Sequence, residues 1–444
     1  MNSKTLASLV LLVTIAFSGN GQISKKKSND ELQKESVEKT IKGKYYLSGF
    51  EKGKGDYNGI HYASNGMVYY FLCTGHLDYG AHMYSFNPET EEVKFIADMA
   101  EVCHEKDQKT IPQGKVHTRI FEYKGKMYFG THTDHYSEDY GKIEIAGTPP
   151  PGYKPYPGGH LISYDMKTGQ LDDLGIIPSK EGVIAMVMDT TRGIIYGITW
   201  PTGYEFAYNV DTKDMRDLGP RSGKGESVTG KEREGLSRAP VVSYADHKVF
   251  FYHNRGSIET YDYERDIFEP FEFTGYDITT EGFLRQAVWS HKDNAIYGNL
   301  NGTNVLFKID PITHHVDSLS RLQPDAALKS GETFDSGLGM VFNEEGNMLY
   351  YVAVAPGGKQ DCILMSNQKM KNYEKCHYEN CNLISYNLDT KERIDHGQII
   401  LQDDIKPVHI NCLATNSKGQ FYAMSYLNLV EGKTDTELLV FSVK

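Results

Sequence analysis

Histidine and arginine side chains recur in the polar stretches between apolar segments, and these residue types can transfer protons and hold anions. Imidazole titrates near neutral pH, and a guanidinium matches a carboxylate with two parallel hydrogen bonds. Loops without a function usually prefer Ser, Asp, Asn and Gly, so we expect a functional surface rather than ordinary polar loops. The residues are His76, His82, His117, Arg119, His132, His135, His160, Arg221, Arg238, His253, Arg255, Arg285 and His409.

A strand ending that recurs about seven times indicates which elements position these residues. The copies lie at 84–87, 162–165, 206–209, 259–262, 307–310, 384–387 and 439–442. An apolar stretch such as Lys126–Gly130 precedes most copies, and a turn followed by another strand comes after most of them. Each copy therefore predicts one β-meander.

A period of about 40 to 50 residues with several strands per unit is typical of a β-propeller. We predict an all-β chain folded as a seven-bladed β-propeller with four-stranded antiparallel blades, forming a single domain over residues 43–444. The abundance of Tyr and Gly, 31 and 43 residues, favours the same fold class. The last copy stops before any outer strand, so an early strand near Lys44 to Ser48 should close the ring.

The N-terminal residues predict export. Lys4 precedes an apolar run from Leu6 to Phe17 and then small residues, which indicates a signal peptide over 1–21 that is too short to leave a membrane span. Residues 22–42 read as a flexible leader. We therefore expect a secreted or periplasmic monomer, and the formal net charge of -12 argues against nucleic-acid partners.

In a four-stranded blade, the loop between the second and third strands lies on the same face as the loop leading into the inner strand. The first kind of loop carries His76, His82, His132, His135, His160, Tyr204, His253 and Arg255. The second kind carries His117, Arg119, Arg221, Arg238, Arg285 and His409. The fold thus predicts that most of these side chains share one face.

Four segments of this face carry distinctive sequence motifs. Residues 130–136, 149–161, 200–204 and 219–221 resemble the propeller ulvan lyases of polysaccharide lyase families 24 and 25. The resemblance implies a secreted lyase that cleaves ulvan, a sulfated algal polysaccharide, by β-elimination at C4 of a uronic acid. No cofactor would be needed for that reaction.

Elimination needs a group that neutralises the uronate, a base for the C5 proton and an acid for the leaving oxygen. We assign Arg221 to neutralisation and Tyr204 to proton transfer, with His160 and His132 as partners. Tyr204 could instead be an aromatic spacer between blades, and Arg221 could pair with an acidic neighbour such as Asp217. The substrate-binding candidates are His117, Arg119, His135, Arg255 and Arg285.

A second cluster, Cys362, Cys376, His377 and Cys381, lies in the long stretch before the sixth strand ending. Three thiolates and an imidazole match a closed tetrahedral zinc site that would organise a loop without its own core. A disulfide is the competing interpretation in a secreted protein, and a distant His291 or His314 could replace His377 as the fourth ligand. Cys73, Cys103 and Cys412 are expected to be buried thiols, or one pair with one spare.

The main functional hypothesis is a polysaccharide lyase whose partner is ulvan. The alternative is a non-catalytic propeller that binds glycans or cell-surface proteins. A glycosidase is disfavoured, because the predicted face is richer in His and Arg than in paired carboxylates.

Overall fold

The structure is a computed structural model that describes residues 39–55, 57–135, 137–139, 142–144, 149–253, 257–279, 284–300, 303, 305–330, 336–354, 381–430 and 433–443. The chain divides into two compact units, Met1–Glu38 and Lys39–Lys444, and all described residues belong to the second. The expected signal peptide and most of the expected leader lie outside the described residues. The second unit is built almost entirely from strands, which confirms the all-β prediction.

Four sheets contain four strands each. One consists of β2 (Ile60–Tyr62), β3 (Val68–Leu72), β4 (His82–Asn87) and β5 (Glu92–Asp98). Another consists of β6 (Phe121–Tyr123), β7 (Lys126–Gly130), β10 (His160–Asp165) and β11 (Leu171–Ile176). A third consists of β12 (Gly182–Asp189), β13 (Ile194–Trp200), β14 (Tyr204–Asn209) and β15 (Asp214–Pro220). The fourth consists of β16 (Val241–Val242), β17 (Val249–Tyr252), β18 (Ile258–Asp262) and β19 (Ile267–Pro270).

The remaining strands form larger or smaller sheets. The five-stranded sheet contains β20 (Thr274–Gly275), β21 (Leu284–Ser290), β22 (Ala295–Leu300), β23 (Val305–Asp310) and β24 (His315–Arg321). The eight-stranded sheet contains β1 (Thr40–Tyr46), β25 (Ser336–Phe342), β26 (Met348–Val354), β27 (Cys381–Asn387), β28 (Arg393–Ile400), β29 (His409–Thr415), β30 (Gln420–Val430) and β31 (Lys433–Ser442). A separate hairpin pairs β8 (Ser137–Asp139) with β9 (Lys142–Glu144).

Helices are short and peripheral to this arrangement. They are α2 (Met99–Val102), α3 (Asp325–Ser330) and the single 3₁₀ turns η1 (Pro178–Lys180), η2 (Gly230–Glu232) and η6 (Gln402–Asp404). No helix in the described part of the chain is long and apolar enough to cross a membrane.

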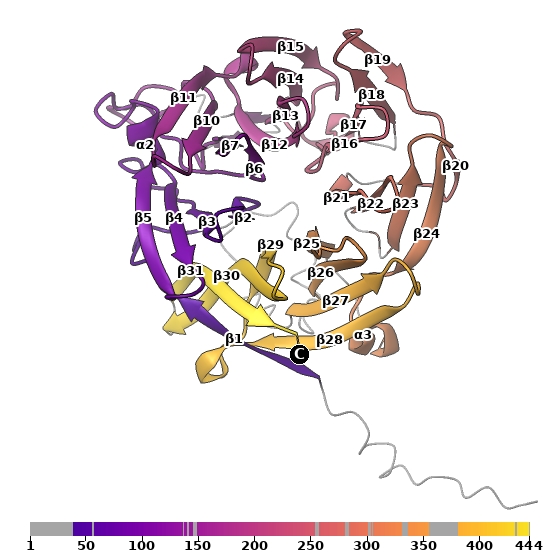
Figure 1. Ribbon diagram of the computed structural model, residues 1–444. Coiled ribbons are helices and arrows are strands. Elements are labelled where there is room, and N and C mark those ends of the chain that lie inside the picture. The colour runs from indigo at the N-terminus through magenta and orange to yellow at the C-terminus, as the bar shows by residue number, and fades with distance from the viewer. Residues whose placement is uncertain are drawn as a thin grey trace, which may run out of the picture. The chain divides into compact units, whose positions relative to one another are not determined.

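Within the unit Lys39–Lys444 the sheets follow one another in chain order around a ring (Figure 1). The first strands of successive sheets contact one another: β12 contacts β16, β16 contacts β21, and β21 contacts β25. β29 contacts both β25 and β2, so the strand succession returns to its start. The seven recurrent strand endings fall on β4, β10, β14, β18, β23, β27 and β31, each within an antiparallel meander.

The early strand β1 joins the two ends of the chain. Gly43 to Tyr46 pair antiparallel with β31, and Thr40 to Lys42 pair parallel with β28. The pairing with the last strand was expected, although it begins at Gly43 and the strand itself begins at Thr40, before the expected domain start at residue 43. β1 covers an edge of β31 that would otherwise expose unpaired backbone groups.

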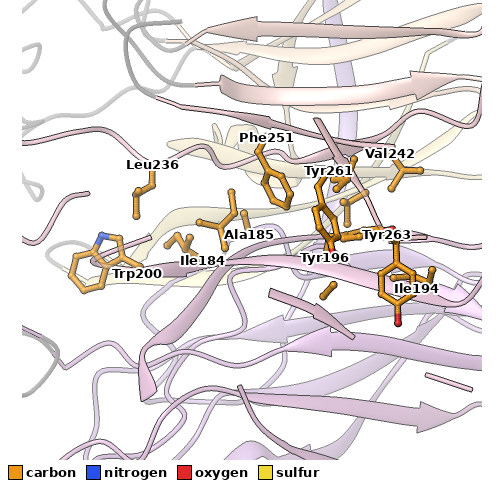
Figure 2. Close-up of a cluster of buried hydrophobic side chains, with 14 residues drawn as sticks. Ile184, Ala185, Ile194, Tyr196, Trp200, Leu236, Val242, Phe251, Tyr261 and Tyr263 are labelled. Atoms are coloured by element: carbon orange, nitrogen blue, oxygen red, sulfur yellow. The ribbon is translucent and has the colours of Figure 1, made fainter. Parts of the chain in front are cut away.

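Facing sheets bury aromatic and aliphatic side chains against each other. In Figure 2, Tyr196 and Ile184 come from the sheet of β12–β15, whereas Phe251, Tyr261 and Val242 come from the sheet of β16–β19. Full burial of one such side chain contributes roughly 1.5–3 kcal/mol, so these interfaces hold neighbouring sheets in fixed relative positions. The ends of the loops that join these strands are therefore held in fixed relative positions as well.

Candidate functional site

Two of the predicted histidines meet where the chain approaches β6 and leaves β7. After Gly130 the chain stays extended, and His132 forms a backbone bridge with Lys115, with both N···O distances 2.8 Å. His117 follows Lys115 by two residues. This bridge brings the loop after the second strand beside the segment leading into the first strand, as the propeller geometry predicts.

The backbone fixes a different tautomer on each of these imidazoles. His117 Nδ1 lies 2.7 Å from the Ile184 carbonyl, which can only accept, so Nδ1 carries the hydrogen. The backbone N–H of Thr133 donates to His132 Nδ1 at 2.6 Å, so that nitrogen is unprotonated. Burial lowers the pKa of both rings well below 6.5, and nearby cations lower it further. At neutral pH, His117 therefore presents an accepting Nε2 and His132 a donating Nε2–H.

The cations that act on these rings are Lys115 and Arg238. The Lys115 ammonium forms a 2.5 Å ion pair with Asp134 and lies 4.7 Å from the centre of the Tyr57 ring. The same Tyr57 ring lies 4.5 Å from the His117 ring. The Lys115 ammonium, the Tyr57 phenol and the neutral His117 imidazole thus lie side by side in that order. Such an arrangement is suited to binding an acidic group and moving a proton.

Arg238 is held by a buried carboxylate. Its guanidinium lies 2.9 Å from Glu226 Oε1, and it also donates to the Leu236 carbonyl at 2.6 Å. Burial alone raises the pKa of Glu226, but the charge and hydrogen bonds of Arg238 outweigh this and lower it to about 2. Glu226 also accepts from the Trp200 indole at 2.9 Å, and the His132 ring lies 5.6 Å from that indole.

A cavity of about 590 Å³ lies among the first strands of the sheets, and His117 and Arg238 both line it. Arg119, a predicted substrate-binding residue, lines it as well. Its guanidinium reaches strand β21, where it donates to the Ala287 carbonyl at 3.0 Å and to Gln286 Oε1 at 2.7 Å. Burial lowers the pKa of Arg119 to about 10.

His160 is enclosed by carboxylates. Nδ1 donates to Asp173 at 2.9 Å, and Nε2 lies 3.3 Å from Glu105. Burial by itself lowers the pKa of His160, but the hydrogen bond to Asp173 and the adjacent Cys103 and Glu105 outweigh it and raise the pKa to about 12. The ring is therefore an imidazolium at neutral pH, and in this state it has no free lone pair with which to act as a base.

A buried network extends from this imidazolium. Gln113 donates to Glu105 at 2.9 Å and to the Gly158 carbonyl at 2.9 Å, and it accepts from Tyr156 and Thr131. The network ties the segment 149–161, with its distinctive Pro and Gly residues, to the loop that follows α2. The chemistry of His160 in the structure is that of a charged anchor for this segment.

Tyr204 and Arg221 lie at one end of the β14–β15 ladder. Tyr204 pairs with Pro220, the residue before Arg221. The Arg221 guanidinium binds Glu259 with two hydrogen bonds of 2.6 and 3.0 Å and lies 4.1 Å from the centre of the Phe268 ring. Its carboxylate partner is thus Glu259, whereas Asp217 accepts from the backbone of Gly219.

His253 completes the group around Arg221. Nε2 lies 3.1 Å from Glu259, and Nδ1 lies 3.0 Å from Ser222 Oγ. The adjacent His253 ring, together with Arg221, lowers the pKa of Glu259 to about 2. The neighbouring Glu205 is deeply buried, and burial raises its pKa well above 4.5.

The structure therefore separates the four predicted catalytic residues into three groups. His132 belongs to the group around Lys115 and His117, His160 to the group with Glu105 and Asp173, and Tyr204 and Arg221 to one strand end. His135 is partly buried, and its Nε2 has no hydrogen-bond partner within the described residues. Arg285 Nη2 lies 3.4 Å from Asn411 Oδ1, and Arg255 lies outside the described residues.

Other predicted histidines have structural partners. His82 stacks on Phe50 with ring centres 3.7 Å apart and lies 3.4 Å from Asp98. His76 lies 3.8 Å from Asp78. His409 is the first residue of β29 and is buried.

Of the predicted zinc ligands, only Cys381 is described; Cys362, Cys376 and His377 lie outside the described residues. Cys381 is fully buried at the start of β27, and its Sγ lies 3.5 Å from the Pro407 carbonyl. His314 contacts the Glu272 carbonyl, and His291 packs against Tyr244. No group of three potential metal ligands occurs among the described residues. Cys73, Cys103 and Cys412 are buried, as expected.

Sequence reasoning missed Lys115, Tyr57 and Glu226. Lys115 could have been found from its spacing, because residues two apart in an extended segment share a face and Lys115, His117 and Arg119 have that spacing. Tyr57 and Glu226 reach the site from distant segments, and their sequence context carries no comparable signal.

Comparisons with known proteins support the fold. No family model matches the sequence, and no curated protein matches it. Among solved structures, the β-propeller domain of Cps50 (Swd1) from Myceliophteria thermophila is 10% identical with a TM-score of 0.50, over 88% of this chain and 97% of that one. A chain of a mitotic checkpoint complex is 10% identical with a TM-score of 0.47, over 88% and 92% of the two chains. The class that fold and comparison define is a β-propeller.

Proposed function

We propose that the chain is a secreted seven-bladed propeller that cleaves uronic-acid polysaccharides, ulvan in particular, by β-elimination. The blade count follows from counting the eight-stranded sheet as two blades, β25–β28 and β29–β31 with β1. The five-stranded sheet counts as one blade with an added β20. The signal-like N-terminus supports export, and the segments similar to ulvan lyases support the substrate.

The observation that carries the proposed reaction is the state of His117. The Ile184 carbonyl holds its Nδ1–H, and the lowered pKa keeps Nε2 free to accept a proton at neutral pH. We assign His117 as the base that removes the C5 proton. Lys115 and Arg238 stabilise the negative charge that develops on the uronate in the transition state.

His132 is a positioning residue in this scheme. Only 2% of its surface is exposed, and its ring packs against Trp200, whose hairpin presents Tyr204. Tyr204 keeps its assignment to proton transfer, and with His117 as the base we assign it to protonate the leaving oxygen. The charged His160 anchors the segment 149–161 beside this hairpin.

Arg221 keeps its assignment as a uronate-binding residue on the strength of the resemblance. Because Glu259 occupies both of its hydrogen-bonding positions, substrate must displace that carboxylate. Arg221→Lys should therefore lose most turnover and fold normally, because an ammonium cannot replace the bidentate contact. Activity equal to wild type would remove Arg221 from the mechanism.

Structural zinc at Cys362, Cys376, His377 and Cys381 remains part of the proposal. Its support is the ligand chemistry of these four residues in the sequence. Metal analysis of the purified protein should find one zinc per chain. Absence of zinc together with disulfides found by mass spectrometry would refute the assignment.

The lyase proposal is tested by following ultraviolet absorbance, because each elimination creates a conjugated unsaturated uronate. Purified protein should raise the absorbance of an ulvan solution, and His117→Gln should slow the rise roughly 10²- to 10⁴-fold, the usual contribution of a general base. His315→Gln is the matched control, since His315 is exposed and pairs with Asp317 far along the chain from this site. If wild type produces no rise with any uronate polymer while still binding it, the protein is a glycan-binding propeller instead.

A further inference from the structure

The cavity among the first strands contains a guanidinium whose charge has no carboxylate partner. Both hydrogen bonds of Arg119 go to neutral oxygens, the Ala287 carbonyl and the Gln286 amide. No carboxylate in the described part of the chain forms an ion pair with it, in contrast to Arg238, Arg221 and Arg192. A partly buried charge without a counter-ion is costly, so this position is expected to bind an anion.

The unused donors of Arg119 suit a carboxylate. A guanidinium has five N–H groups, and only two have acceptors here, so three remain. A planar carboxylate can take two of them at once. A cavity of about 590 Å³ lies within the range of small-molecule sites.

A second unsatisfied donor lines the same cavity. The Trp289 indole Nε1 is buried and has no hydrogen-bond partner among the described residues. Trp289 and Ala287, the residue that Arg119 contacts, are two positions apart on β21, which corresponds to roughly 7 Å along a strand. Because both residues line the cavity, the two donors together suit a ligand that carries a carboxylate and a second acceptor.

Much of the remaining wall is apolar, although polar residues such as His61, Thr118 and Thr415 also line it. Ile60, Ala185, Val241, Met340 and Leu413 line the cavity. Such a wall favours a ligand with a compact hydrocarbon body between its polar ends and disfavours a fully hydrated ion such as phosphate. The Arg119 charge, the Trp289 donor and the apolar part of the wall therefore all favour a small organic acid.

We propose that the central cavity binds a small organic carboxylate, with the acid group on Arg119 and a second oxygen on the Trp289 indole. The site shares its cavity with His117 and Arg238 of the proposed lyase site, but it takes a free small acid and is measured without polysaccharide, so it does not depend on lyase activity. A free small acid and a uronate of a polysaccharide chain share the carboxylate chemistry, so the experiment has to separate these two sources.

Calorimetry and fluorine NMR measure the binding directly, in the absence of polysaccharide. Benzoate and 4-fluorobenzoate should bind wild-type protein at one saturable site, and Arg119→Met should weaken binding roughly tenfold to hundredfold, as expected for hydrogen bonds to a charged group. Arg265→Met is the control, because Arg265 is an exposed surface residue paired with Glu269, and it should bind as wild type does. Equal affinity in Arg119→Met, or no saturable binding to wild type, would overturn the proposal.

Two further arms identify the ligand class. In wild type 4-hydroxybenzoate should bind more tightly than benzoate, and Trp289→Phe should abolish that difference while benzoate binding is unchanged. Phosphate should not compete with benzoate; if phosphate binds and benzoate does not, the organic-acid assignment is wrong. Displacement of benzoate by ulvan fragments as effective as by free acids would assign the cavity to the polysaccharide and refute a separate site.

The same group of variants includes a control for loss of folding. If Arg119→Met does not fold, Arg119→Lys retains a cation but lacks the planar fork and should still lose several-fold in affinity. Unchanged benzoate affinity in Arg119→Lys would exclude the contact with Arg119, and absence of tighter 4-hydroxybenzoate binding in wild type would exclude the contact with Trp289. Lyase assays on the same variants are scored separately, so failure of one proposal leaves the other intact.

Discussion

The role of His160 can be decided by replacing it with Gln, which keeps a similar size but removes the positive charge. The structure places this charge between Glu105 and Asp173, whose side chains are 5% and 19% exposed. Removing it leaves two carboxylates close together, and one oxygen of Glu105 already has no hydrogen-bond partner among the described residues. Breaking such a buried pair costs about 3–5 kcal/mol of the free energy of unfolding.

This cost is large enough to measure by two methods. The folded unit has about 400 residues, and an unfolding entropy of ~2 cal/mol/K per residue converts 3–5 kcal/mol into a fall in Tm of about 4–6 °C. Guanidinium unfolding should show a lower midpoint with an unchanged slope. His315→Gln removes a comparable but exposed ion pair with Asp317, so it should change stability by less than about 0.5 kcal/mol.

The pH dependence gives a second, independent test. The pKa of His160 is about 12 in the folded protein and near 6.5 in the unfolded chain, so the folded state retains a proton that the unfolded chain releases. The stabilisation is therefore complete below pH 6.5 and declines as the pH rises from 6.5 toward 12. The difference in stability between wild type and His160→Gln should be greatest near pH 6 and smaller at pH 9 to 10. A loss below about 1 kcal/mol at pH 6, or a difference that grows with pH, would refute the buried-imidazolium argument.

Two other predictions concern the proposed base and its neighbour. The pKa of His117 lies well below 6.5, so the acidic limb of the kcat/KM profile for ulvan cleavage should lie below pH 6.5; a limb centred at 6.5 or above would exclude His117 as the base. Gly182→Ala would place a Cβ inside van der Waals contact distance of the His132 ring. We expect a loss of about 1–3 kcal/mol in unfolding free energy together with reduced turnover. Normal stability and turnover in Gly182→Ala would contradict the proposed packing of His132.

The sequence by itself determined the all-β fold, because the repeated strand ending and its spacing depend only on local residue patterns. The same repeats located the third strand of each meander and the early strand that pairs with β31. They also placed His117 and His132 in neighbouring loops, since both positions follow from the order of strands within one sheet.

Only the tertiary structure decided what each titratable group can do. His160 and Arg221 look alike in sequence as loop residues next to Gly or Pro, yet one is a charged anchor between Glu105 and Asp173 and the other is held by Glu259. These partners lie on other segments, and Glu259 is 38 residues away from Arg221. Burial and distant charges set the pKa and the free hydrogen-bonding positions, and neither quantity can be obtained from the spacing of residues along the chain.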